Sequence, residues 1–206
     1  MKQYETTTIK DYAFDQNAYV ITNKNKEAII IDPGYGVNAI KEYITSHELS
    51  VKALVLTHYH FDHVAGVDEL AKAFDVKAYV HVNDFDLLIN NDLAQKFGFA
   101  PVEVNKENVL TFEEALEIPG FEIRVQNLPG HSKGSTLLFI ENEVFTGDVL
   151  FINAIGRTDL VDSSEKEMTK TIKWIKENID PETLVKPGHG EEEMFKNILK
   201  NNKYLI

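Results

Sequence analysis

The sequence THYHFDH, from Thr57 to His63, places four potential metal ligands within six residues. It follows a continuous apolar run at residues 53–56, which is typical of a strand buried on both faces. A helical pattern at residues 64–74 comes next. The ligand-type side chains therefore lie where a buried strand is expected to turn into a helix.

The four side chains divide into two pairs. In extended chain, residues two apart point the same way, so His58 and His60 are expected to converge. Asp62 and His63 fall where the helix begins and can point towards a neighbouring position. An isolated histidine is most often a structural or surface residue, but three histidines and an aspartate this close together favour a metal site.

Three further candidates each lie beside a glycine and after a predicted strand. They are His131 in PGHS, Asp148 in TGD and His189 in PGHG. Each motif alone would indicate only a turn. Together they place every remaining candidate at the end of a strand, where functional residues concentrate. The other two histidines, His47 and His81, are interpreted as surface or structural residues.

The rest of the pattern alternates strands with helices. We expect a hairpin at residues 18–31, helices at 37–48, 84–90, 164–178 and 191–199, and strands at 77–81, within 109–145 and at 184–186. The chain shows no repeat or linker, so we expect one domain over residues 1–206. Two β-rich halves with attached helices fit an α/β class, or α+β in some schemes.

Composition narrows the function classes. With 21 Lys and Arg against 33 Asp and Glu, the formal net charge is −12, which disfavours a nucleic-acid partner. The chain has no cysteine, which excludes disulfides and thiolate metal ligands. Its first residues lack the apolar core of an export signal, and no run approaches the ~18 apolar residues of a membrane span. We therefore expect a cytoplasmic protein without a membrane partner.

In its motifs the chain resembles the glyoxalase II-like branch of the metallo-β-lactamase superfamily. H-x-H-x-D-H is present as THYHFDH, and PGHS, TGD and PGHG follow in the family's order. IDPG at residues 31–34 and GRTDL at residues 156–160 are also typical. The resemblance covers residues 17–190 and is specific for the fold and the metal site, much less so for the substrate.

The resemblance implies a four-layer αββα sandwich with two metal ions at one edge of the sheets. His58, His60 and His131 would hold the first ion, Asp62, His63 and His189 the second, and Asp148 would bridge them. Asp62 and Asp148 would also take part in catalysis. Asp32 matches an acidic family position that orients a metal-bound histidine, although an aspartate before proline is equally typical of a simple turn.

The ligand set suggests the chemistry. Imidazole and carboxylate ligands suit two divalent ions, with Zn expected and Fe or Mn also compatible. Two such ions lower the pKa of a shared water towards ~7, and the resulting hydroxide can attack a carbonyl carbon. A thiolate leaving group, with an ordinary pKa of ~8.5, needs little help from an acid. We therefore expect a thioesterase whose substrate is hydroxyacyl-glutathione or a similar small acylthiol.

The residues expected to recognise the substrate differ from those of the long-form glyoxalase II enzymes. Those carry a C-terminal domain that holds glutathione, whereas only residues 191–206 follow the last motif here. Arg157 and Asp159 occupy the positions of a Lys and a Tyr that contact glutathione in the long forms. Arg157 is the candidate substrate anchor because its guanidinium can bind a carboxylate in fork geometry. The competing interpretation is an ion pair between Arg157 and Asp159 or Asp162.

Several other functions remain to be weighed against a thioesterase. GRTD also occurs in the sulfur (persulfide) dioxygenase branch, whose members use one iron, and this is the main alternative. A redox relative would need a flavin domain, and nucleases of the superfamily bring extra domains and a basic surface. The sequence shows none of these features, which disfavours both classes. The β-lactamase branches are usually exported, and two of their three classes use a cysteine. The oligomeric state is left open.

Overall fold

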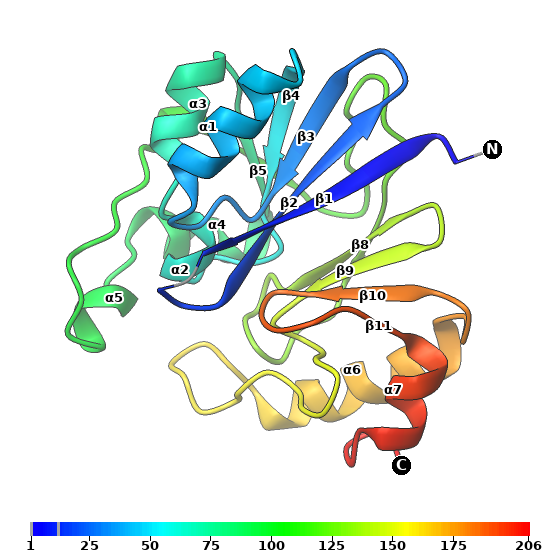
Figure 1. Ribbon diagram of the computed structural model, residues 1–206. Coiled ribbons are helices and arrows are strands. Elements are labelled where there is room, and N and C mark those ends of the chain that lie inside the picture. The colour runs from blue at the N-terminus through cyan, green and yellow to red at the C-terminus, as the bar shows by residue number, and fades with distance from the viewer. Residues whose placement is uncertain (1, 12) are drawn as a thin grey trace.

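Two β-sheets face each other in the computed structural model, which describes residues 2–11 and 13–206 (Figure 1). The first sheet has the order β1-β2-β3-β4-β5-β6, and the second the order β11-β10-β9-β8-β7. The first sheet comprises β1 (Tyr4–Asp11), β2 (Gln16–Asn23), β3 (Glu27–Ile31), β4 (Ser50–Val55), β5 (Ala78–His81) and β6 (Val109–Phe112). The second comprises β7 (Arg124–Asn127), β8 (Thr136–Ile140), β9 (Glu143–Gly147), β10 (Leu184–Pro187) and β11 (Glu193–Met194).

Helices cover the outer face of each sheet. The helices α1 (Val37–Ser46) and α3 (Val67–Phe74) lie on the first sheet, and α6 (Glu165–Asn178) and α7 (Phe195–Asn201) on the second (Figure 1). The short helices α2 (Phe61–Val64), α4 (Val82–Ile89), α5 (Leu93–Lys96) and the 3-10 turn Lys106–Asn108 complete the fold. The expected α/β class and four-layer αββα sandwich are confirmed.

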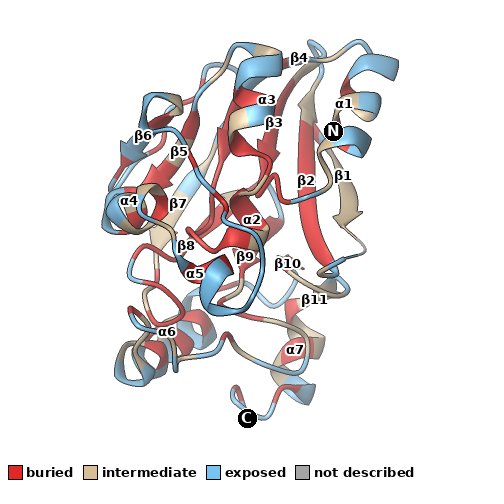
Figure 2. Ribbon diagram, turned by 90° about the vertical axis from the view of Figure 1, so that its left-hand side faces the viewer, coloured by how far each residue is buried: buried red, intermediate tan, exposed pale blue. Residues whose placement is uncertain are grey.

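Three apolar cores separate the four layers, because alternate residues of a strand face opposite sides of its sheet. In β3, Ala28 and Ile30 pack beneath α1 and α3, whereas Ile29 and Ile31 face the second sheet. In β9, Val144 packs with α6 and α7. Figure 2 shows the buried strands enclosed by helices whose outer faces are exposed. The inner strands β2, β3, β8 and β9 are thus buried on both faces over most of their length.

Most expected elements are present, with differences where pairing or close packing overrides local pattern. The predicted helix at residues 191–199 is wrong at its start, because Glu193 and Met194 pair with β10 before α7 begins. The helical stretch after the histidine motif is split into α2 and α3 at Gly66, whose amide donates to the carbonyl of Pro33 at 2.7 Å. β1 was not predicted as a separate strand and pairs over its full length with β2.

The sheets are joined at the edge where several strands end. The amide of Asn17 donates to the carbonyl of Gly188 at 2.8 Å, and the amide of Thr136 donates to that of Thr57 at 2.9 Å. β3 and β4 run parallel, as do β9 and β10, so the residues after them emerge at this edge. Over the residues that the structure describes, no helix is long and apolar enough to cross a membrane.

Candidate metal centre

The seven predicted ligands meet at this edge, although they come from five separate segments. His58 and His60 follow β4, and Asp62 and His63 lie in α2. The other three, His131, Asp148 and His189, come from the β7–β8 loop and from the ends of β9 and β10. Strand ends therefore deliver side chains that are up to 131 positions apart (58 to 189) in the sequence to one place.

His58, His60 and His131 form the first group. Their ligand atoms all lie within 4.8 Å of one another, and the three residues are buried. Each has an Nε2 atom that is shielded from solvent and has no hydrogen-bond partner among the described residues. An unsatisfied buried nitrogen is costly, so three that converge form a site that fits an electron-pair acceptor.

Asp62, His63 and His189 form the second group. His189 Nε2 lies 3.2 Å from Asp62 Oδ2 and 3.2 Å from His63 Nε2. Their ligand atoms also fall within 4.8 Å of one another. This group is less buried than the first, since the side chains of His189 and Asp62 are 25% and 15% exposed.

Asp148 reaches both groups. Its Oδ1 atom lies 3.2 Å from His63 Nε2 and 3.5 Å from His189 Nε2, while Oδ2 lies 3.6 Å from His131 Nε2. Close backbone packing makes this reach possible. A Cβ on Gly188 would lie only 2.2 Å from Asp148 Oδ1, so a larger residue there would displace the carboxylate.

Hydrogen bonds at the opposite ring nitrogen orient the histidines. The Nδ1 atoms of His131 and His189 each lie 3.0 Å from a backbone carbonyl oxygen, that of Arg157 and of Phe14 respectively. A carbonyl only accepts, so in the neutral ring Nδ1 carries the proton and Nε2 keeps its lone pair. The two Nε2 atoms are therefore set up as ligands.

Asp32 fixes two more rings. Its Oδ2 atom lies 2.9 Å from His63 Nδ1 and accepts from Thr57 Oγ1 at 2.6 Å, while Oδ1 accepts from the amide of Thr57 at 2.8 Å. Since the Thr57 hydroxyl gives its hydrogen to Asp32, its oxygen accepts from His58 Nδ1, 3.0 Å away. Asp32 thus leaves Nε2 of both His63 and His58 free, as the orienting interpretation predicted.

The charges around the site follow from this geometry. Burial lowers the pKa of His58, His60 and His131. Burial alone would also lower the pKa of His189, but Asp148 and Asp62 raise it to about 10. For Asp148, burial alone would raise the pKa, yet His63 and His189 hold it well below its usual range. Protons and metal ions would therefore compete for the same lone pairs.

The donor set fits divalent metal ions. Nε2 lone pairs and carboxylate oxygens converge, and when the imidazoles are neutral and the carboxylates ionised none of these atoms has a hydrogen to share. Cations at this place would satisfy the three orphaned nitrogens and the Asp148 Oδ1 atom, which is likewise buried without a hydrogen-bond partner among the described residues. His58, His60 and His131 would hold one ion, Asp62, His63 and His189 another, with Asp148 between them; this assignment stays a prediction.

Asp84 was missed by the sequence analysis. It lies buried on α4 and accepts hydrogen bonds from the amide of Tyr59 at 3.1 Å, from Ser132 Oγ at 2.7 Å and from the amide of Gly134 at 2.5 Å. Burial raises the pKa of Asp84 to about 7 against the effect of the bonds from Ser132 and Gly134. Asp84 therefore fastens the loop that carries His131 to the segment that carries the first two histidines. An aspartate on the buried face of a helix, four residues before Leu88, was the available signal.

Neither of the two unassigned histidines lies in the cluster. His47 is exposed at the end of α1, where its ring stacks on Tyr43 at 4.1 Å. His81 is buried, and its Nδ1 atom caps α4 by accepting from the amide of Asn83 at 3.2 Å.

Arg157 is committed to an ion pair. Its Nε and terminal nitrogens donate to the two carboxylate oxygens of Asp159 at 2.7 and 2.9 Å. Asp162 instead accepts from the hydroxyl of Tyr59. Both members of the Arg157–Asp159 pair are exposed, so an anion can compete for the guanidinium. Its role as substrate anchor stays a prediction.

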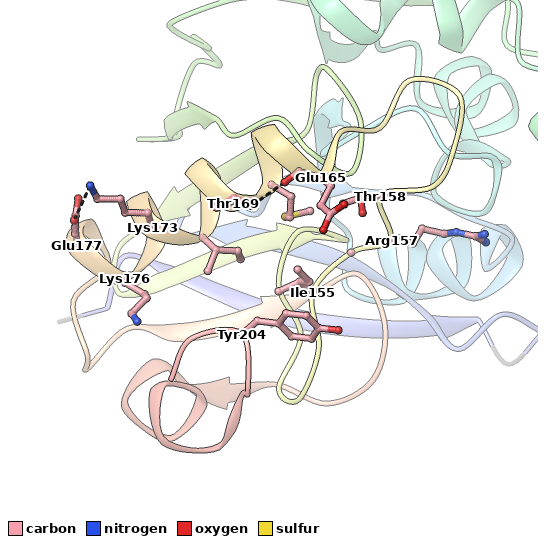
Figure 3. Close-up of a pocket in the computed structure, with 12 residues that line it drawn as sticks. Ile155, Arg157, Thr158, Glu165, Thr169, Lys173, Lys176, Glu177 and Tyr204 are labelled. Atoms are coloured by element: carbon pink, nitrogen blue, oxygen red, sulfur yellow. Dashed lines mark hydrogen bonds and ion pairs between the residues drawn. The ribbon is translucent and has the colours of Figure 1, made fainter.

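A cavity of about 850 Å³ lies behind the loop that contains Arg157. Its lining includes Ile155, Met168, Lys176 and Tyr204 and none of the seven candidate ligands. The side chain of Arg157 extends away from the other lining residues (Figure 3). This cavity is therefore separate from the metal centre.

Comparison with known proteins identifies the family of the chain. The family model of the metallo-beta-lactamase superfamily matches residues 11–190. The chain belongs to the metallo-beta-lactamase superfamily. Hydroxyacylglutathione hydrolase GloC of Haemophilus influenzae is 32% identical over 206 residues, which cover 94% of each chain.

Two solved structures resemble this chain over nearly its whole length. The BLEG-1 B3 metallo-beta-lactamase superposes with a TM-score of 0.89 at 32% identity, covering 98% of this chain and 99% of that one. TTHA1623 in a di-iron-bound form gives 0.87 at 32% identity, covering 97% and 100%. Superfamily members are metal-dependent hydrolases, and the convergent lone pairs of this chain suit that chemistry.

Proposed function

We propose that this chain is a binuclear metal-dependent thioesterase that hydrolyses hydroxyacyl-glutathione or a similar small acylthiol. The observation that carries the proposal is the cluster of five histidines and two aspartates whose free electron pairs converge. The likeness to GloC supports a thioester substrate. We take Zn as the expected metal, with Fe or Mn as alternatives that the same ligands suit.

Different residues of the chain would have different roles in catalysis. When bound, the metal ions supply an activated water nucleophile and a Lewis acid for the carbonyl oxygen. Asp148 keeps the two groups of histidines in register. Asp62 Oδ2 lies 3.2 Å from His189 Nε2, and the Asp62 carboxylate would accept the proton of an attacking water.

The chemistry of the leaving group distinguishes thioesters from amides and oxygen esters as substrates. The Nε2 atoms of the five histidines point into the cluster, so these rings are not free to protonate a leaving group. A thiolate departs without such help, because the ordinary pKa of a thiol is ~8.5. An amine or alkoxide leaving group would need an acid that the cluster does not supply.

A persulfide dioxygenase with a single iron is the second candidate. The first group of ligands is more buried than the second. Its three histidine nitrogens could hold a single ion without any ligand from the second group. Hydrolysis of β-lactams is a further outcome to test, because BLEG-1 is a B3 metallo-beta-lactamase.

Metal analysis together with three assays tests the proposal. Protein purified without chelator and saturated with added metal should contain two ions per chain and hydrolyse acylthiols. The control is the same protein stripped of metal and then reloaded. One iron per chain with persulfide-dependent oxygen uptake would replace the thioesterase by the dioxygenase, and turnover of a β-lactam alone would replace it by a lactamase.

A further inference from the structure

An aromatic wall lies next to the candidate metal ligands. Its five rings are Phe14, Tyr35, Phe61, Phe97 and Phe99, contributed by four segments of the chain. Tyr35, Phe97 and Phe99 are 40%, 45% and 47% exposed, although each is large and mostly apolar. The wall thus exposes the rings of Tyr35, Phe97 and Phe99 to solvent, whereas Phe61 is buried in the core of the first sheet.

The rings form one connected surface. Phe14 contacts Tyr35, Phe61 and Phe99 with centroid distances of 5.1, 5.5 and 5.2 Å. Phe61 also lies 5.5 Å from Phe99 and 6.3 Å from Phe97. These are ordinary distances for interacting aromatic pairs, so the rings hold one another in place.

The wall is attached to the ligands themselves. Phe61 lies between His60 and Asp62 in the sequence, and the carbonyl oxygen of Phe14 accepts the hydrogen bond from His189 Nδ1. Figure 2 shows α5, which leads into Phe97 and Phe99, beside α2 at the same side of the molecule. The rings therefore border the ligands, where a substrate bound at the cluster can contact them.

One cationic side chain, that of Arg157, lies next to the aromatic wall. The Cζ atom of Arg157 lies 5.5 Å from the centroid of the Phe97 ring. A polar thiol carrier with carboxylates suits this charged end, whereas the uncharged rings suit an apolar acyl group. The two ends of the wall therefore match the two ends of a thioester.

We propose that the aromatic wall binds the acyl group, so that the enzyme prefers acylthiols with an apolar acyl body, such as hexanoyl or phenylacetyl, over acetyl and lactoyl. This inference rests on the proposed thioesterase function and names its substrate class. The preference follows from burial of apolar surface against the rings, which changes affinity about fourfold for each methylene that is fully buried.

A thioester series made with each of two thiol carriers tests the inference on the unaltered, metal-loaded enzyme. Acetyl, lactoyl, hexanoyl and phenylacetyl thioesters of glutathione and of N-acetylcysteamine are compared by kcat/KM. Hexanoyl adds four methylenes to acetyl, so partial burial should favour it by at least roughly tenfold with either carrier. Equal rates across the acyl series, or a preference that follows the carrier instead, would overturn the inference.

Variants locate the effect. Phe97→Ala and Phe99→Ala, with Phe97→Leu and Phe99→Leu as milder changes, should lower kcat/KM for hexanoyl more than for acetyl. Tyr204→Ala is the matched control, because Tyr204 is as exposed as Phe97 but lines the separate cavity. A hexanoyl preference that survives all four phenylalanine variants would contradict the assignment to the wall.

A binding measurement separates this inference from the proposed function. Calorimetry of the S-hexyl and S-methyl thioethers of glutathione, which cannot be hydrolysed, needs neither metal nor turnover. Tighter binding of the hexyl compound, weakened in Phe97→Ala but not in Tyr204→Ala, supports the wall even if no thioester is hydrolysed. Thioester hydrolysis without any such difference supports the thioesterase and overturns the wall.

Discussion

Asp32 offers a sharp test of how the protein prepares its metal ligands. The side chain is buried and accepts three hydrogen bonds, two from Thr57 and one from His63 Nδ1. Asp32→Asn keeps the size of the side chain and is tolerated at the positive φ of 49°. The amide, however, has one accepting oxygen where the carboxylate has two.

Both orientations of the new amide are unfavourable. If its oxygen takes the place of Oδ2, its NH₂ group opposes the amide hydrogen of Thr57. If the group is reversed, the NH₂ faces His63 Nδ1, and the ring must place its proton on Nε2 and lose the lone pair that would bind metal.

The magnitude follows from these contacts. A buried donor left unpaired costs ~1–3 kcal/mol, which should lower the free energy of unfolding of the metal-free variant. Loss of a carboxylate behind a ligating histidine typically weakens metal binding ~10–100-fold. That range corresponds to ~1.4–2.8 kcal/mol, in line with the cost of the unpaired donor.

Chelator competition measures the metal affinity, and chemical unfolding of the metal-free protein measures stability. Asp75→Asn is the control, since Asp75 also has a left-handed backbone, with φ of 54°, but is exposed. Wild-type affinity for both ions in Asp32→Asn would refute the claim that Asp32 sets the histidine tautomer.

Two further predictions concern the bridge and the substrate anchor. Asp148→Ala should reduce metal content and thioester hydrolysis far more than His47→Ala, because Asp148 contacts both ligand groups and His47 lies exposed on α1; substantial activity in Asp148→Ala would refute the bridging role. Arg157→Ala should raise KM with little change in kcat, the signature of lost uniform binding. Asp159→Asn should lower KM by releasing the guanidinium for the substrate. If neither Arg157→Ala nor Asp159→Asn shifts KM, the ion pair is purely structural.

The sequence by itself determined the parts of the protein that local spacing controls. Alternation in extended chain placed His58 and His60 on one side, and the strand-then-glycine pattern located His131, Asp148 and His189 at strand ends. The apolar run at residues 53–56 predicted a strand buried on both faces, which is the end of β4 and the residue after it. These signals are strong because they depend on backbone periodicity within a few residues.

Only the tertiary structure decided which distant groups meet. The sequence left Asp32 between a turn residue and an orienting carboxylate, and it left Arg157 between an anchor and an ion pair. The fold brings Asp32 to His63 and Arg157 to Asp159, and it gathers five aromatic rings next to the ligands. The physical reason is that these contacts depend on how the two sheets are aligned. Hydrogen bonds between residues that are remote in the sequence hold the sheets together, and no local pattern encodes that alignment.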